Sequence, residues 1–197
     1  MQKLTRADLL SLEQYSERRP EFRQQVMDHK KPRRIALGDH LTLCFEDRLT
    51  MQYQVQEMLR VERVFEVAGI EEELAAYNPM IPDGSNWKAT LMIEYEDIAE
   101  RDLALRQLVG IEDVVVLRIG DNPPLACFPD DDLERSREEK TAAVHFMRWE
   151  LTAADREALA AGAPIIAAVE HPAYTIAAHE LSAQSRQSLV NDLALDS

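Results

Sequence analysis

The sequence has few of the residues that mark a secreted, fibrous or intrinsically disordered chain. Its 197 residues include two cysteines, six glycines and nine prolines. Glycine and proline contents this low exclude a collagen-like or low-complexity chain. Cys44 and Cys127 lie far apart without a CxxC pair, so no zinc-binding spacing is present. Both lie in apolar strand-like segments, which predicts two buried free thiols in a reducing compartment.

Segments that would target the chain to a membrane are also missing. The N-terminal stretch "MQKLTRADLLSLEQYSERR" is charged throughout, unlike a signal peptide. The longest apolar run is far shorter than the roughly 20 residues that span a bilayer. We therefore expect a cytoplasmic protein that does not associate with membranes.

Basic residues are in short supply. There are 22 bases against 36 acids, and the formal net charge of −14 disfavours nucleic acid and anionic membranes as partners. The local exception is "HKKPRR" at residues 29–34. This cluster is typical of a solvated helix C-terminus, where cations are favourable. It is also compatible with a small anion site for phosphate or carboxylate, and less so with nucleic-acid binding.

The usual catalytic and cofactor motifs are absent as well. The sequence contains no GxSxG, GxGxxG, Walker or HExxH motif, and no two of its five histidines share a helical spacing. Neither cysteine lies in the basic, exposed setting of a nucleophile. No metal site is predicted, and the cofactor, if the protein uses one, stays unknown.

The residues that are present predict a globular α+β protein. A hydrophobic content of 46% and a charged content of 29% suit one domain over residues 1–197, helix-rich in about 1–80 and strand-rich in about 87–197. Short strands with tight turns favour an antiparallel sheet, which we expect helices to cover on one face. Expected features include a hairpin of 33–37 with 41–45, two strands turning at 121–124, and a solvated charged segment at 130–140.

A long central helix is predicted at about residues 47–67, with Gly69 as its C-cap and a second helix at about 70–77. At 100° per residue, this helix has two apolar arcs, and each contains one glutamate, Glu57 or Glu62. A buried carboxylate needs a partner, so both glutamates are expected either to form structural ion pairs, Glu57 with Arg60, or to bind a ligand or metal. Apolar residues on two sides of the helix, with Met51 and Met58 among them, favour a homodimer.

The loop and strand "YNPMIPDGSNWKATLMIEYE" gather polar side chains. Strand alternation puts Trp87, Ala89, Leu91 and Ile93 on a core face. The other face and the loop could wall a polar pocket closed by a glutamate of the long helix. Alternatively, these loop residues only cap turns. The candidate ligand-binding residues are Glu57, Glu62, Tyr77, Asn78, Lys88, Thr90, Glu94, His145 and Arg148.

Several stretches resemble one bacterial family. They are "HKKPRRIALGDHLTLCFEDRLTMQYQVQEMLRVERVFE", "YNPMIPDGSNWKATLMIE", "GIEDVVVLRIGD", "EEKTAAVHFMRWEL" and "VEHPAY". By these blocks the chain resembles the domain of unknown function family 3501 over nearly its whole length. The resemblance implies a cytoplasmic bacterial protein, and it supplies no catalytic residues. Members of the family are often encoded beside rubrerythrin-like and iron–sulfur oxidoreductase genes, which implies redox protein partners by association.

Two classes of function follow from the residues and the resemblance. The first is a non-catalytic accessory or small-ligand-binding protein that works with redox or peroxide-stress systems. The second is a metal-dependent enzyme that uses Glu57 or Glu62 together with His145. The absence of known catalytic motifs favours the first class.

Overall fold

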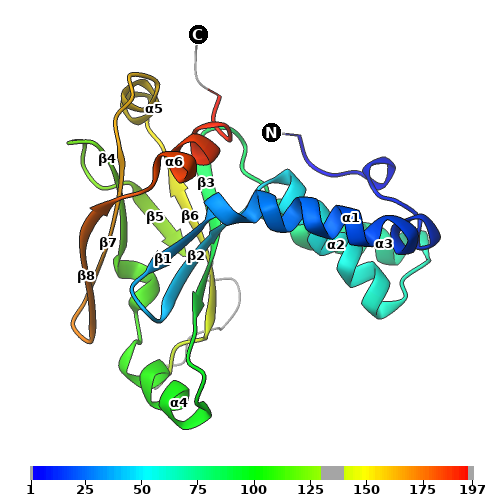
Figure 1. Cartoon of the computed structure of the whole chain (residues 1–197), viewed down its shortest axis with the longest axis horizontal. Helices are drawn as coiled ribbons and strands as arrows, with labels where there is room; N and C mark the ends of the chain where they lie inside the picture. The colour runs from blue at the N-terminus through cyan, green and yellow to red at the C-terminus, as the bar shows by residue number, and fades with distance from the viewer. Residues whose placement is uncertain (1, 130–139, 195–197) are drawn as a thin grey trace.

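The computed structural model describes residues 2–129 and 140–194 and shows an α+β protein with two parts (Figure 1). Within these residues, eight strands form two antiparallel sheets, and three helices extend to one side of them. We call this three-helix unit the helical arm: α1 (Leu12–Lys30), α2 (Arg48–Glu62) and α3 (Val67–Tyr77). The α+β class predicted from the sequence is confirmed.

The larger sheet has the strand order β1-β2-β3-β6-β5, and all its pairings are antiparallel. Its strands are β1 (Arg34–Leu37), β2 (Leu41–Phe45), β3 (Asn86–Ile93), β5 (Ala126–Pro129) and β6 (Val144–Glu150). The predicted N-terminal hairpin is thereby confirmed as β1 and β2. Because this hairpin lies between α1 and α2 in the chain, the helical arm is rooted at one edge of the larger sheet.

The smaller sheet has the order β4-β7-β8 and was not predicted as a separate sheet. Its strands are β4 (Val115–Ile119), β7 (Ile165–His171) and β8 (Tyr174–Glu180). The two strands predicted on either side of residues 121–124 are present as β4 and β5, but they do not pair with each other: β4 pairs with β7, and β5 pairs with β6. The physical reason is burial, because β7 is apolar on both faces and offers β4 far more buried contact than the half-exposed β5 does.

The main hydrophobic core lies between the two sheets. The predicted inward face of β3 is confirmed, since Trp87, Ala89, Leu91 and Ile93 are all buried. Leu117 of β4 and Val169 of β7 belong to the same cluster. It also includes Leu105, Leu159 and Leu189, which come from α4 (Ile98–Gln107), α5 (Ala153–Ala160) and α6 (Ala183–Val190). The cover expected from helices therefore comes in large part from a second sheet.

A second, smaller hydrophobic cluster holds the helical arm together. It joins α2 and α3 to the N-terminal segment through Leu4, Met51, Val55, Leu59, Leu74 and Ile81. The buried apolar residues thus form two clusters and not one continuous core. The assignment of residues 1–197 to a single domain stays a prediction.

The long helix predicted at about 47–67 is shorter than expected. Asp47 caps α2 by accepting the Thr50 N–H at 2.9 Å, but the helix ends at Glu62 because Arg63 adopts a left-handed conformation with φ 56°. Gly69 is not a C-cap. It lies inside α3, where a Cβ would approach Val64 Cγ1 to 2.7 Å. This glycine therefore marks a close contact between segments and not the end of a helix.

The longest helix of the described chain is α1, with 19 residues against 15 for α2. Pro20 lies inside α1, and the helix runs through it. A proline removes one helical N–H, and at this exposed position water can satisfy the carbonyl left without a partner.

The arm is joined to the sheets by Arg33, whose side chain is only 2% exposed. Its guanidinium donates to both carboxylate oxygens of Asp192 at 2.6 and 3.2 Å, and to the backbone carbonyls of Phe45 and Glu46 at 3.0 Å. It also lies 3.5 Å from Asp47, whose carboxylate contacts His29 at the end of α1. The expectation that residues 29–34 are simply a solvated helix end is therefore wrong for Arg33.

The contacts at this junction favour the ionised form of the Asp47 carboxyl group. Burial opposes it, but the Arg33 guanidinium, the Thr50 N–H and His29 together hold the pKa of the Asp47 carboxyl below its ordinary value. Asp47 is thus an anion that caps α2 and faces Arg33 at once. We call Arg33, Asp47, Asp192 and His29 the junction network.

Two further sequence predictions concern the outer parts of the chain. Among the described residues, no helix combines the length and the apolar content needed to cross a membrane. The charged segment expected to be solvated at 130–140 lies, apart from Lys140, outside the described residues.

Replacing Arg33 by methionine should destabilise the protein strongly, because two buried carboxylates would lose their cation. Breaking a buried ion pair from one side costs about 3–5 kcal/mol. Urea unfolding measures this change. Arg23→Met, at an exposed position on the preceding helix α1, is the control and should change little. If the two variants unfold at the same urea concentration, the junction network does not stabilise the fold.

Candidate functional site

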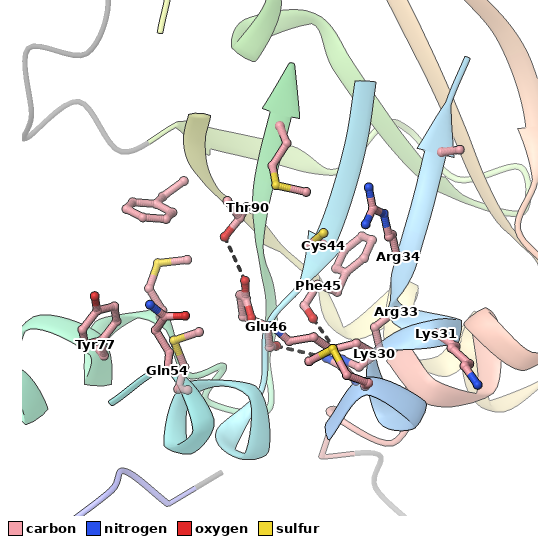
Figure 2. A pocket seen from close by; sticks show the side chains of 16 residues that line it. Lys30, Lys31, Arg33, Arg34, Cys44, Phe45, Glu46, Gln54, Tyr77 and Thr90 are labelled. Atoms are coloured by element: carbon pink, nitrogen blue, oxygen red, sulfur yellow. Dashed lines mark hydrogen bonds between the residues drawn. The ribbon is translucent and has the colours of Figure 1, made fainter. Parts of the chain in front are cut away.

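A groove between the helical arm and the outer face of the larger sheet is the candidate site. It encloses about 850 Å³ and is lined by 16 residues (Figure 2). A cavity of this size suits a small organic molecule. The opposite face of the same sheet is filled by the main core, so the strands present one face to the core and one to this groove.

The sheet wall of the groove follows from strand alternation and register. Arg34, Cys44, Thr90 and Phe146 form one row across β1, β2, β3 and β6, because each is the register partner of the next. A neighbouring row contains Ala36 and Met92. Small, sulfur-containing and aromatic side chains thus make an apolar wall with Arg34 at its β1 end.

The arm wall is rich in methionine. Met27 and Lys30 come from α1, and Met51 and Gln54 from α2. Tyr77 and Met80, at and just after the end of α3, complete this wall. Together with Met92, four of the seven methionines in the chain line the groove. Methionine side chains are flexible and polarizable, and they adapt to apolar ligands of different shapes.

Glu46 lies on the groove between the two walls, and it is 6% exposed. Its two carboxylate oxygens accept hydrogen bonds from the Thr90 hydroxyl at 2.8 Å and the Thr50 hydroxyl at 2.7 Å. Both donors are neutral, and among the described residues no base lies within ion-pair distance of this carboxylate. Glu46 is therefore an acidic side chain held by two hydroxyl groups at the junction of arm and sheet.

Cys44 lies two residues before Glu46 in the sequence and carries a thiol. Its surroundings do not activate this thiol as a nucleophile. Burial raises the pKa of its thiol, and the negative charge of Glu46 raises it further. Burial also raises the pKa of Cys127, to about 12. Both are free cysteines, as predicted, and both remain neutral thiols near pH 7.

Of the nine residues predicted for a pocket, Tyr77 and Thr90 line the groove. Asn78 instead holds the N-terminal segment, through the Leu4 N–H at 2.8 Å and the Leu4 carbonyl at 2.9 Å. Lys88 donates to the carbonyls of Pro79 and Ile81 and so fixes the loop. Neither residue lines the groove, and neither matches the turn-capping alternative, because Asn78 bonds a segment 74 residues away and Lys88 is a half-buried residue of β3.

Two more of the residues predicted for a pocket, Glu94 and Arg148, form ion pairs at the surface of the larger sheet. Glu94 accepts both hydrogen bonds of an Arg34 amino group at 2.9 and 3.0 Å, and the Thr42 hydroxyl at 2.6 Å. Arg148 donates to Glu150 at 2.8 Å. None of Glu94, Arg148 and Glu150 lines the groove.

The prediction that Glu57 and Glu62 both lie in apolar arcs of the helix is wrong for Glu62. Glu62 is exposed, because α2 buries the face that carries Thr50, Met51, Val55, Gln56 and Leu59. Glu57 is largely covered, and its carboxylate is paired on the side facing α1. It accepts from Arg19 at 2.7 and 2.9 Å, from Tyr15 at 2.6 Å and from the predicted partner Arg60 at 3.2 Å. Glu57 is thus a structural ion pair that does not line the groove.

His145 lies on the other face of the sheet, in the core. Its Nε2 is 2.9 Å from both the Thr141 hydroxyl and the Ala142 carbonyl, and its Nδ1 is 3.7 Å from Glu112. The metal-enzyme alternative needed His145 beside Glu57 or Glu62, and the fold does not bring these residues together. In the part of the chain that the structure describes, no three His, Cys, Asp or Glu side chains are grouped for metal binding.

Sequence reasoning missed Glu46, Cys44 and Lys30 as site residues. The signal was present in "LTLCFE", where Thr42, Cys44 and Glu46 alternate with buried Leu43 and Phe45. We interpreted this segment as uniformly apolar, so its outward face was overlooked. Lys30 belongs to the "HKKPRR" cluster, for which an anion site was one of the alternatives.

A family model for a protein of unknown function, DUF3501, matches residues 3–193. The chain belongs to the DUF3501 family. A crystal structure of a "novel protein of unknown function" from Burkholderia pseudomallei K96243 is similar, with 48% sequence identity and a TM-score of 0.93. The similarity covers 98% of this chain and 100% of that one. No curated protein matches the sequence. The family resemblance predicted from the sequence is confirmed.

Glu57→Gln should change how stability depends on pH. Hydrogen bonds from Arg19, more than those from Tyr15 and Arg60, hold the pKa of Glu57 at about 2 against an ordinary 4.5. A depressed pKa stabilises the fold above the ordinary value, and this stability is lost as the pH falls from 4.5 towards 2. Thermal melts across this range should show a weaker acid dependence in Glu57→Gln and a lower melting temperature at pH 7.

Glu62→Gln is the matched control, because it makes the same change on the same helix at an exposed position. Its melting curves should follow those of the unmodified protein. Equal behaviour of the two variants would show that the Arg19–Glu57 pair does not contribute.

Proposed function

We propose that this DUF3501 protein is a non-catalytic small-ligand-binding protein, and that its site is the groove between the helical arm and the larger sheet. The observation that carries the proposal is an apolar, methionine-rich cavity of about 850 Å³ on a sheet face that would otherwise meet water. Unfilled apolar surface of this extent is costly for a protein to expose, and binding sites are the usual exception.

Chemistry at the groove also favours binding over catalysis. The one thiol among its lining residues has a raised pKa because of burial and Glu46. The Glu46 carboxylate already accepts two hydroxyl hydrogen bonds from Thr50 and Thr90. Among the described residues, no hydrogen bond joins the Cys44 thiol to a base that would activate it as a nucleophile.

The setting that we propose is the cytoplasm of a bacterium, where Cys44 and Cys127 stay reduced. An accessory role beside redox or peroxide-stress proteins rests on the gene association of the family. We expect the shape of the groove to differ between the free and the ligand-bound protein. Redox partners would recognise this difference in shape.

The neutral lipophilic dye Nile red tests whether the groove binds an apolar ligand. Because the dye is uncharged, the charged side chains around the groove do not attract or repel it. We expect its fluorescence to rise on binding, and we expect it to slow alkylation of Cys44, which lines the groove, relative to Cys127, which does not. Ala36→Trp, which places a large ring on the groove wall, should weaken binding by about tenfold, which corresponds to about 1.4 kcal/mol. Ala177→Trp, at an exposed position on the edge strand β8, is the control. Equal dye binding by both variants would place the site elsewhere.

The homodimer stays a prediction, and its basis has changed. Met51 is buried inside the arm, whereas Val61, Phe65 and Val67 at the turn from α2 to α3 are 63%, 64% and 50% exposed. We expect these side chains to be covered by a second copy. Light scattering at micromolar concentration should give twice the chain mass, and Phe65→Ser should reduce it. A monomer mass for the unmodified protein would rule out the dimer.

A further inference from the structure

The charges around the groove are opposite to those of the rest of the chain. The protein carries a formal charge of −14, yet the groove is lined by four bases and one acid: Lys30, Lys31, Arg33 and Arg34 against Glu46. All four bases come from the "HKKPRR" segment. A cleft of one sign with low-dielectric walls concentrates ligands of the opposite sign.

These four bases differ in how strongly they are already engaged. Arg33 is committed to Asp192 and the junction network. Lys31 and Arg34 make surface pairs with Asp28 and Glu94, and both members of each pair are at least 45% exposed. Exposed pairs of this kind are worth at most about 1 kcal/mol, so a bound ligand can replace the acidic partner.

Of the four bases, Lys30 is the most available to bind a ligand. It is the last residue of α1, where the helix dipole favours a cation, and it is half-buried on the groove. Its ammonium lies 5.9 Å from the centre of the Tyr53 ring. Among residues 2–129 and 140–194, no acid lies within ion-pair distance of it. Arg34 is the register partner of Cys44, and Lys30 and Arg34 both act electrostatically on the Cys44 thiol, so the two cations lie on the same part of the groove.

Building on the proposed function, we infer that the groove binds an amphipathic organic anion, a carboxylate with an apolar chain. The carboxylate lies at Lys30 and Arg34, and the chain lies over the apolar wall of Ala36, Met92 and Phe146 and the methionines of the arm. Glu46 is the one acid among the lining residues, and we expect the carboxylate of the ligand to lie away from it, on the side of Lys30 and Arg34.

Three ligands with the same ten-carbon chain and different head groups test this inference: decanoate, decanol and decyltrimethylammonium. Each competes with Nile red for the groove. We expect decanoate to displace the dye at concentrations about tenfold lower than the other two, as one charge-assisted hydrogen bond to Lys30 would give. Added salt should weaken the displacement by decanoate and leave that by decanol unchanged.

Two variants identify the basic end. Lys30→Gln should remove the advantage of decanoate over decanol, whereas Arg23→Gln, which removes the same charge from an exposed position on α1, should keep it. Glu94→Gln should strengthen decanoate binding, because it removes the acid that Arg34 now contacts. A gain of affinity cannot result from a misfolded variant.

The outcomes separate this inference from the proposed function. Equal displacement by all three ligands would retain a ligand-binding groove and overturn its preference for anions. Stronger displacement by decyltrimethylammonium would also overturn it, with Glu46 then selecting a cation. If Nile red itself neither binds nor protects Cys44, the proposed function fails together with the inference.

Discussion

The Arg33 guanidinium is the constraint on which the arrangement of the two parts of the molecule depends. It is nearly inaccessible to water, and its donors satisfy carbonyls of the β2–α2 connection, a carboxylate at the start of α2 and a carboxylate near the end of the described chain. Such a cation is stable only while these acceptors surround it. The direction in which the helical arm leaves the larger sheet is thereby fixed, and so is the width of the groove between them.

A single basic segment therefore has two roles that its sequence does not distinguish. In "HKKPRR", all four bases lie along the groove, but the buried guanidinium of Arg33 is bound within the junction network, whereas Lys30, Lys31 and Arg34 are more accessible. Alternation explains the difference for the two arginines, because Arg34 begins strand β1 facing outwards and Arg33 precedes it facing inwards. The interpretation of this segment as a solvated helix end therefore fails for Arg33, and an anion site at Lys30 and Arg34 stays a proposal.

Features set by local patterns were predictable from the sequence, and features set by long-range contacts were not. The inward face of β3 and the β1–β2 hairpin follow from alternation and turn residues, and both are confirmed. The second sheet could not be predicted, because the choice of β7 as partner for β4 depends on burial that only the folded chain provides. The site was recovered in part: Tyr77 and Thr90 line the groove, while Glu57 needed Arg19 on another helix to explain its position.

The junction network also sets an order of events during synthesis of the chain. Asp192 follows Arg33 by 159 residues, so every element of both sheets leaves the ribosome before the strongest partner of this cation does. Until then Arg33 has only the hairpin carbonyls and Asp47 within its own part of the chain. The nascent helical arm can form its own small core early, but its attachment to the sheets is a late step with a high loop-closure cost. All the residues that line the groove, from Met27 to Phe146, leave the ribosome before Asp192, so the walls of the groove are complete in the chain before the contact that fixes them together.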